Sequence, residues 1–181
     1  MSKINKDNFR KLCLSKLQFF SKRTKIKRDR TICSKIINII KIHKPKKILL
    51  YIPLKMEVDV RPIINELRKQ KNIEVYVPYM KGESFVPVKY RLPLQKKKFN
   101  IKEPNYSSFR NNNINLDLIV VPIVGIDSTY RRVGFGAGMY DRFFDTLKYR
   151  PITIFTQLTL CQTKEIVTDT HDIRADYIIT I

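Results

Sequence analysis

Short apolar runs alternate with segments of helical periodicity, and this alternation limits the folds open to the chain more than any other feature. The run "KKILLYIPL" (46–54) is followed by "EVDVRPIINELRKQ" (57–70), whose apolar residues line one helical face, and then by the β-branched run "IEVYVP" (73–78). A strand, a helix and a strand in close order indicate a βαβ unit, whose parallel strands are buried and therefore continuously apolar.

The same order recurs in the second half of the chain. The apolar run "LDLIVVPIVG" (116–125) leads through a glycine-rich loop into a helix expected over about residues 138–148, and the strand "PITIFT" (151–156) follows. A last short strand is expected in "ADYIITI" (175–181). Two consecutive units of this kind favour a mostly parallel sheet with helices on both faces.

The remaining segments fit around such a sheet. Apolar residues recur at helical intervals over residues 6–43, which indicates two helices, with the basic run "SKRTKIKRDR" as the turn and the start of the second helix. Residues 81–116 are rich in Lys, Asn, Pro and Ser around one candidate strand, "SFVPVKY", and we expect an excursion at the sheet edge. The sequence therefore predicts a single α/β domain over residues 1–181, with three layers, a Rossmann-like sheet and an N-terminal helical pair.

The chain is strongly basic. It carries 36 Lys and Arg against 16 Asp and Glu, a formal net charge of +20 in 181 residues. Such a charge attracts polyanions, so a basic nucleic-acid-binding protein is an alternative to an enzyme with anionic ligands. No RNA- or DNA-binding motif is present, however, and charge runs are usually solvated surface. We therefore expect small anionic ligands and no nucleic acid.

The cysteines and the hydropathy bear on location. Cys13, Cys33 and Cys161 are odd in number, far apart in the sequence and match no metal-ligand spacing, which favours reduced thiols. No apolar stretch approaches the roughly 20 residues of a membrane span, and the N-terminus lacks the apolar core of a signal peptide. These features predict a cytoplasmic protein without membrane contact, and we expect a monomer.

Three of the 5 glycines lie in the single stretch "RRVGFGAGMYDRFF" (131–144). Glycine allows positive φ and close approach of a ligand, and loops at the carboxyl ends of parallel strands often bind phosphate. The spacing excludes a Walker loop, which ends in Gly-Lys-Ser/Thr, and the dinucleotide pattern, whose third glycine is replaced by Met139. A nicotinamide-dependent oxidoreductase is therefore a less favoured alternative. A purely structural turn stays open.

Asp141 follows the glycines directly and has two interpretations. A carboxylate in the first turn of a helix stabilises the helix terminus without any further role. If the loop binds phosphate, however, the carboxylate would repel it unless a divalent cation lay between them, and Mg²⁺ is commonly held by carboxylates and phosphate oxygens. The two features together favour a Mg-nucleotide over bare phosphate.

The stretch "VPIVGIDSTYRRVGFGAGMYDRFF" (121–144) resembles the C-terminal motif of the 5-formyltetrahydrofolate cyclo-ligases, P-x-x-x-x-D-x-x-G-x-R-L-G-x-G-x-G-Y-Y-D-R. Asp127, Arg132, the three glycines, Tyr140, Asp141 and Arg142 fall in register. Further similar segments are the N-terminal K-x-x-x-R of Lys6 and Arg10, and then "YIPLKMEVDV", "FNIKEP" and "THDIRADYIIT". The order of these segments along nearly the whole chain makes the resemblance specific.

The resemblance implies a compact α/β domain that uses ATP and Mg²⁺ to convert 5-formyltetrahydrofolate into 5,10-methenyltetrahydrofolate, with release of ADP and phosphate. It implies that Arg132 and Tyr140 are catalytic and that Asp141 and Asp172 bind the metal. The implied folate-binding residues are Ile52, Glu57, Phe135 and Met139. The implied ATP-binding residues are Lys6, Arg10, Arg132, Gly134, Gly136, Gly138 and Tyr140.

Without the resemblance, several of these residues have ordinary interpretations. Lys6 and Arg10 lie one helical turn apart and could be a basic N-terminus, Glu57 could be a helix-cap neighbour, and Asp172 could be a loop acid. Three positions also depart from the family pattern: Tyr130 replaces a glycine, Met139 a tyrosine and Val60 a threonine. A methionine can still cover a flat ring with its polarisable thioether.

Overall fold

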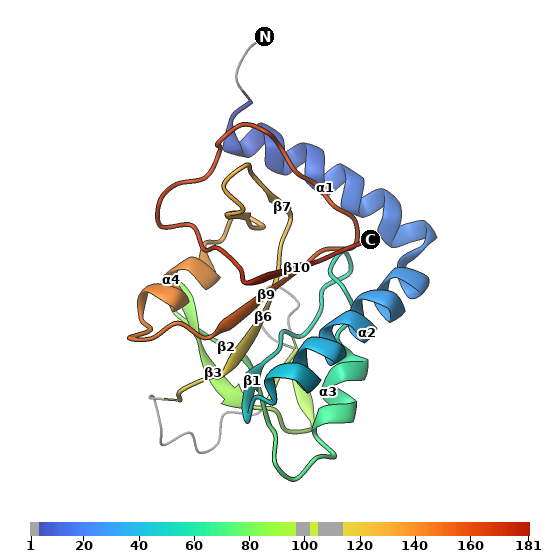
Figure 1. Cartoon of the computed structure of the whole chain (residues 1–181), viewed down its shortest axis with the longest axis vertical. Coiled ribbons are helices and arrows are strands. Elements are labelled where there is room, and N and C mark those ends of the chain that lie inside the picture. The colour runs from blue at the N-terminus through green and yellow to red at the C-terminus, as the bar shows by residue number, and fades with distance from the viewer. Residues whose placement is uncertain (1–3, 97–101, 105–113) are drawn as a thin grey trace.

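The computed structural model of the chain describes residues 4–96, 102–104 and 114–181 and has a six-stranded sheet at its centre (Figure 1). The strand order is β10-β9-β6-β1-β2-β3. Neighbouring strands are parallel from β10 to β2, and β3 is antiparallel to β2 at one edge. The predicted α/β class with a mostly parallel sheet is confirmed. The first three residues of "FNIKEP" lie outside the described residues.

The elements follow the predicted order. The helices are α1 (Lys6–Arg23), α2 (Lys25–His43), α3 (Arg61–Leu67) and α4 (Met139–Asp145). The strands of the central sheet are β1 (Lys47–Leu49), β2 (Glu74–Lys81), β3 (Ser84–Lys89), β6 (Leu118–Pro122), β9 (Ile152–Thr156) and β10 (Tyr177–Ile179). Two small antiparallel pairs, β4 (Leu94–Lys96) with β5 (Lys102–Pro104) and β7 (Gly125–Ile126) with β8 (Arg132–Val133), were not predicted.

The two faces of the sheet carry separate apolar clusters because side chains alternate along each strand. Ile48 and Leu50 pack with α1, α2 and α3 on one face, whereas Leu49 packs with Phe143 of α4 on the other. Figure 1 shows α2 and α3 on one side of the sheet and α4 on the other. The predicted three layers are therefore present, with the N-terminal helical pair on one face.

Local signals explain the limits of the N-terminal helices. Asn5 caps α1, and its side-chain oxygen accepts a hydrogen bond from the Asn8 backbone N–H. Only Thr24 separates α1 from α2, inside the basic run in which the turn was predicted. No helix among the described residues is long and apolar enough to cross a membrane.

The cysteines differ from the prediction of reduced thiols. Cys13 of α1 and Cys161 of the segment after β9 form a disulfide across 148 residues of sequence, and Cys33 is a free, buried thiol. The prediction was wrong for Cys13 and Cys161, because their spacing in the sequence does not indicate that folding brings them together. The disulfide attaches α1 to the segment after β9.

Candidate functional site

A mostly apolar cavity of about 250 Å³ opens where β1, β2 and β6 end and the glycine loop begins. Two of its lining residues, Tyr51 and Pro122, stand at the carboxyl ends of β1 and β6. In open parallel sheets this edge is the usual place for ligands. The lining residues are Tyr51, Ile52, Leu54, Glu57, Pro78, Met80, Phe85, Pro122, Arg132, Phe135, Ala137, Gly138, Met139 and Tyr140.

Glu57 is the acidic residue of the cavity lining and is only 8% exposed. Its Oε2 accepts a hydrogen bond of 2.7 Å from the Leu54 backbone N–H. Burial raises the pKa of Glu57 to about 7, although that hydrogen bond and the charge of Lys25 act in the opposite direction. The carboxyl group therefore titrates near neutral pH inside the cavity.

Two tyrosines of the cavity differ in their hydrogen bonds. The Tyr51 hydroxyl donates to the Val58 carbonyl oxygen and pairs with the Thr156 hydroxyl. Among the described residues, two buried side-chain polar atoms have no hydrogen-bond partner: the Tyr140 hydroxyl and Arg131 Nε. Burial raises the pKa of Tyr140 far above its usual value, so the hydroxyl keeps its proton. Because a buried polar group without a partner is costly, this hydroxyl fits a site completed by a ligand or water.

The glycine loop joins β8 to α4, and two of its residues have the positive φ that glycine adopts readily. Gly136 has a φ of +109° and Gly138 a φ of +61°. Nothing lies within 4 Å of where a Gly136 Cβ would stand, so the space above the loop is open. A Cβ on Gly134 would instead collide with the guanidinium of Arg132.

Arg132 connects the cavity to a group of charged residues. It is 4% exposed, lines the cavity and lies over the Tyr140 ring, with 5.6 Å from its Cζ to the ring centroid. Its Nε and Nη2 donate to the two carboxylate oxygens of Asp141 at 3.0 and 2.6 Å. Such a bidentate pair is both strong and geometrically specific.

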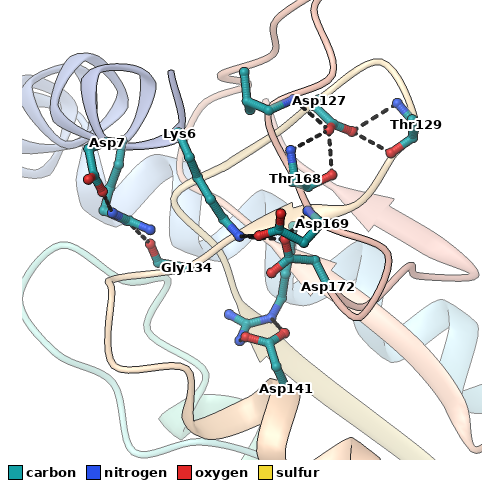
Figure 2. A network of polar contacts seen from close by, with 12 residues as sticks. Lys6, Asp7, Asp127, Thr129, Gly134, Asp141, Thr168, Asp169 and Asp172 are labelled. Atoms are coloured by element: carbon teal, nitrogen blue, oxygen red, sulfur yellow. Dashed lines mark hydrogen bonds and ion pairs between the residues drawn. The ribbon is translucent and has the colours of Figure 1, made fainter. Parts of the chain in front are cut away.

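The first turn of α1 brings two more cations to the same region (Figure 2). Lys6 Nζ donates to Asp172 Oδ2 at 2.5 Å and to Asp169 Oδ2 at 3.0 Å. Burial acts to lower the pKa of Lys6, but the hydrogen bonds and charges of the two aspartates outweigh it and raise that pKa. Arg10 Nε donates to the Gly134 carbonyl oxygen at 2.9 Å, so α1 contacts the glycine loop directly.

Asp127 connects its own turn, which includes Thr129, to the loop between β9 and β10 (157–176), here called the C-terminal loop. One carboxylate oxygen accepts hydrogen bonds from the backbone N–H and hydroxyl of Thr129, and the other from Val167 and Thr168. Burial acts to raise the pKa of Asp127, but these hydrogen bonds outweigh it and hold the pKa at about 2. Asp127 thereby fixes the loop that carries Asp169 and Asp172.

Asp169, His171 and Asp172 form a group that could hold a cation. Their potential ligand atoms lie within 4.8 Å of one another, and Asp172 is buried whereas the other two are exposed. Carboxylate oxygens are the ligands that Mg²⁺ prefers, and one or two of them with phosphate oxygens are sufficient. The donor set therefore fits a magnesium ion.

A family model for the 5-formyltetrahydrofolate cyclo-ligase family matches residues 2–181. The chain belongs to this family. The similarity seen in the sequence motifs is confirmed, and with it the prediction of an enzyme.

Individual cyclo-ligases resemble the chain at moderate identity. The 5-formyltetrahydrofolate cyclo-ligase of Haemophilus influenzae is 28% identical over 123 residues, which is 63% of this chain and 64% of that protein. The cyclo-ligase of Mycoplasma genitalium is 26% identical over 97% of this chain and 98% of its own length. The solved structure of Aquifex aeolicus 5,10-methenyltetrahydrofolate synthetase is 29% identical, with a TM-score of 0.80 over 97% of this chain and 89% of that chain.

The structure brings the predicted cyclo-ligase residues together in two adjoining groups. Ile52, Glu57, Phe135, Gly138, Met139 and Tyr140 line the cavity with Arg132. Lys6 and Asp172 form one ion pair, Arg132 and Asp141 form another, and Arg10 contacts the glycine loop at the Gly134 carbonyl oxygen. Gly136 lies in the loop between β8 and α4 and does not line the cavity.

Residues whose roles depend on long-range contacts could not be predicted from the sequence. Asp169 beside Lys6, the Asp127 connection between loops, and the cavity residues Tyr51, Met80 and Phe85 were not assigned. Asp127 had a signal, because it fell in register with the family motif.

Tyr130 is informative among the departures from the cyclo-ligase pattern. It occupies a position where the pattern has glycine, and its φ is +59°. This left-handed conformation is unusual for a tyrosine and explains the glycine of the pattern.

Proposed function

We propose that the chain catalyses the ATP- and Mg²⁺-dependent conversion of 5-formyltetrahydrofolate into 5,10-methenyltetrahydrofolate, with ADP and phosphate as the other products. The observation that carries the proposal is the position of Arg132. This side chain lines the apolar cavity and also pairs with Asp141, so a flat ligand in the cavity would meet the charged groups at one residue. Membership of the cyclo-ligase family supports the same reaction.

The cavity is the proposed folate site. Ile52, Phe135 and Met139 provide apolar surface for the pterin-like ring, and Glu57 accepts hydrogen bonds from the ring nitrogens. The Tyr140 hydroxyl, which has no partner in the part of the chain that the structure describes, donates to the bound substrate or phosphoryl group. An apolar cavity with few polar groups matches the usual chemistry of a small-molecule site.

The adjoining charged group is the proposed ATP site. Lys6, Arg10 and Arg132 supply cations, and the open space above Gly136 lets backbone groups approach the phosphates. Asp172, with Asp169 beside it, would hold Mg²⁺, and Asp141, which the structure pairs with Arg132, would be the second carboxylate ligand. When bound, the metal neutralises phosphate charge during transfer.

The reaction needs phosphate activation because the formyl oxygen is otherwise a poor leaving group. The formyl oxygen attacks the γ-phosphorus and the bond from this phosphorus to the β-γ bridging oxygen breaks, which releases ADP. N10 then attacks the formyl carbon and loses its proton, and the carbon–oxygen bond breaks to release phosphate. The enzyme's task is to align the formyl oxygen with the γ-phosphorus and to stabilise charge, which Arg132 and Lys6 can do.

A direct assay tests the proposal. Purified protein is mixed with 5-formyltetrahydrofolate, ATP and Mg²⁺, and the methenyl product is followed by its absorbance. We expect product only when both ATP and Mg²⁺ are present, with one phosphate released for each methenyl group formed. Absence of ATP-dependent product would refute the proposed function. The cytoplasmic location and the monomeric state remain predictions.

A further inference from the structure

In the structure, cations proposed for the phosphates are bound to carboxylates proposed for the metal. Lys6 contacts Asp172 and Asp169, and Arg132 makes a bidentate pair with Asp141. Figure 2 shows Lys6 reaching down from α1 to the two aspartates of the C-terminal loop. The charged side chains of the site therefore neutralise one another in pairs.

The side chains of these ion pairs are largely buried, so breaking a pair is energetically costly. The side chains of Asp172 and Arg132 are 5% and 4% exposed, and that of Lys6 is 25% exposed. Removing one partner of a buried ion pair leaves an uncompensated charge, which is strongly unfavourable. Neither Asp172 nor Arg132 can therefore give up its partner unless a new opposite charge replaces it.

The metal alone, the nucleotide alone and the two together differ in whether they supply the replacement charges that these side chains need. A magnesium ion alone would bind Asp172 while Lys6 stayed nearby as a repelling cation. A triphosphate alone would bind Lys6 and Arg132 while the freed carboxylates faced its negative charges. The metal and the triphosphate together neutralise all of these charges, because the carboxylates pair with the metal and the cations pair with the phosphates.

We propose that Lys6 and Arg132 block the metal-binding carboxylates until a nucleotide takes these cations, so that the metal and the triphosphate bind in a coupled exchange of ion-pair partners. The inference rests on the proposed ATP and Mg²⁺ site. Coupling between two ligands is reciprocal and commonly changes each affinity by about 5- to 150-fold. The exchange protects the site from a metal without nucleotide and makes Lys6 a determinant of metal affinity.

Lys6 offers the clearest test because its side chain is partly exposed and it lies at the start of α1, so its replacement should leave the chain folded. Binding of Mn²⁺, a paramagnetic substitute for Mg²⁺, is measured by electron paramagnetic resonance in protein without nucleotide and again with saturating ATP, both without folate. The variants are Lys6→Met and, as a second neutral replacement, Lys6→Gln. The matched control is Lys16→Met, because Lys16 also lies on α1 and, among the described residues, donates to the Leu160 carbonyl oxygen and to no carboxylate of the site.

Removal of the Lys6 charge should tighten Mn²⁺ binding in the nucleotide-free protein by about tenfold, as expected for loss of a competing charge-assisted contact. The ratio of Mn²⁺ affinities with and without ATP should fall by a similar factor. Lys16→Met should match the wild type, and Asp172→Asn added to Lys6→Met should abolish the gain. Thermal unfolding of each variant verifies that it is folded.

Unchanged or weaker Mn²⁺ binding in both Lys6 variants, without nucleotide, would overturn the inference. The measurement needs neither folate nor turnover and therefore separates the two proposals. Methenyl product with unchanged Mn²⁺ affinity in the Lys6 variants would retain the proposed function and reject the exchange. Tighter Mn²⁺ binding in the Lys6 variants, together with no methenyl product from the wild type, would support the exchange and reject the proposed function.

Discussion

Glu57 combines deep burial with a carboxyl group inside the proposed folate cavity. Its ordinary pKa of 4.5 is raised to about 7, so without ligand the neutral acid is favoured up to near neutral pH. A neutral acid loses one acceptor site, whereas the carboxylate can accept two hydrogen bonds from a pterin-like ring. Ionisation of this one group should therefore control folate affinity.

The predicted result is a folate KM that falls as the pH rises from 6 to 8. Over this interval the ionised fraction of Glu57 grows from about one tenth to about nine tenths for a pKa near 7. The measurement is the KM for 5-formyltetrahydrofolate across the pH range at saturating Mg-ATP. Glu57→Gln should raise the KM and remove the pH dependence, and an equally steep profile in this variant would contradict the assignment.

The same shift has a consequence for stability with a definite sign. The folded-state pKa of Glu57 lies above its unfolded value. The contribution of Glu57 to the free energy of unfolding is therefore fully present below about pH 4.5 and is lost as the pH rises through about 7. Asp127 acts in the opposite direction. Its folded-state pKa of about 2 lies below the ordinary 3.8, so its contribution is present above the ordinary value and is lost as the pH falls through about 2.

Tyr130 gives a residue-level prediction for stability. Its left-handed φ of +59° costs about 1 to 2 kcal/mol in a residue with a Cβ, and its side chain is 52% exposed, so little packing is lost on replacement. Tyr130→Gly should raise the free energy of unfolding by roughly 1 kcal/mol after the extra entropy of glycine is subtracted. Urea denaturation measures the change. Tyr130→Ala retains the Cβ and should show no such gain, and equal stabilisation by both variants would exclude backbone strain as the cause.

At the level of elements, α1 matters because it carries Lys6 and Arg10 to the glycine loop and the C-terminal loop. Phe9, Cys13 and Leu17 bury one face of the helix, and Gly125 is so close that a Cβ there would lie 2.8 Å from Phe9 Cε1. The disulfide between Cys13 and Cys161 adds a covalent connection on the same face. The position of the proposed phosphate-binding cations therefore depends on how α1 packs.

Reduction of this disulfide should lower the free energy of unfolding by about 2 to 4 kcal/mol, since it closes a long loop in the unfolded chain. Loosening of α1 should also weaken ATP binding. Thermal unfolding and calorimetric ATP titration are compared with and without dithiothreitol. Cys161→Ala serves as the control, because it lacks the bond in both conditions and should not respond to the reductant. Identical unfolding of the oxidised and reduced wild type would refute a stabilising disulfide.

At the level of the whole molecule, the proposed ATP site joins parts of the chain that are remote in sequence. Lys6 and Asp172 lie 166 residues apart, and Arg132 pairs with Asp141 between them. A ligand that binds these elements at once stabilises the folded state of the entire chain, because the unfolded chain has no such site. The net charge of +20 also favours the approach of anionic ligands.

Mg-ATP at about 100 times its Kd should therefore raise Tm by roughly 5 to 10 °C, which corresponds to about 2.7 kcal/mol of binding energy in a chain of this size. Differential scanning calorimetry measures the shift. Sodium sulfate at equal ionic strength controls for general effects of anions on a basic protein. An equal shift with sulfate would show that charge alone, and no specific ATP site, causes the stabilisation.

The sequence determined the order of strands and helices and the family of the chain. Apolar periodicity is local, so the runs at 46–54, 116–125 and 151–156 each indicated a buried strand, and β1, β6 and β9 lie within them. The glycine motif named Arg132, Phe135, Met139, Tyr140 and Asp141, whereas Ile52, Glu57, Lys6, Arg10 and Asp172 came from the other segments that resemble the cyclo-ligase pattern. Positive φ at Gly136 and Gly138 agrees with the conformational role expected of these glycines.

Only the tertiary structure decided which distant residues meet. The Cys13–Cys161 disulfide, the contacts of Asp127 with Val167 and Thr168, and the pairing of Lys6 with Asp169 each join segments far apart in the chain. Local periodicity carries no information about such pairs, because they depend on how the helices pack and where the loops turn. The sequence therefore named most of the charged residues of the site, whereas their pairing with one another followed from the fold.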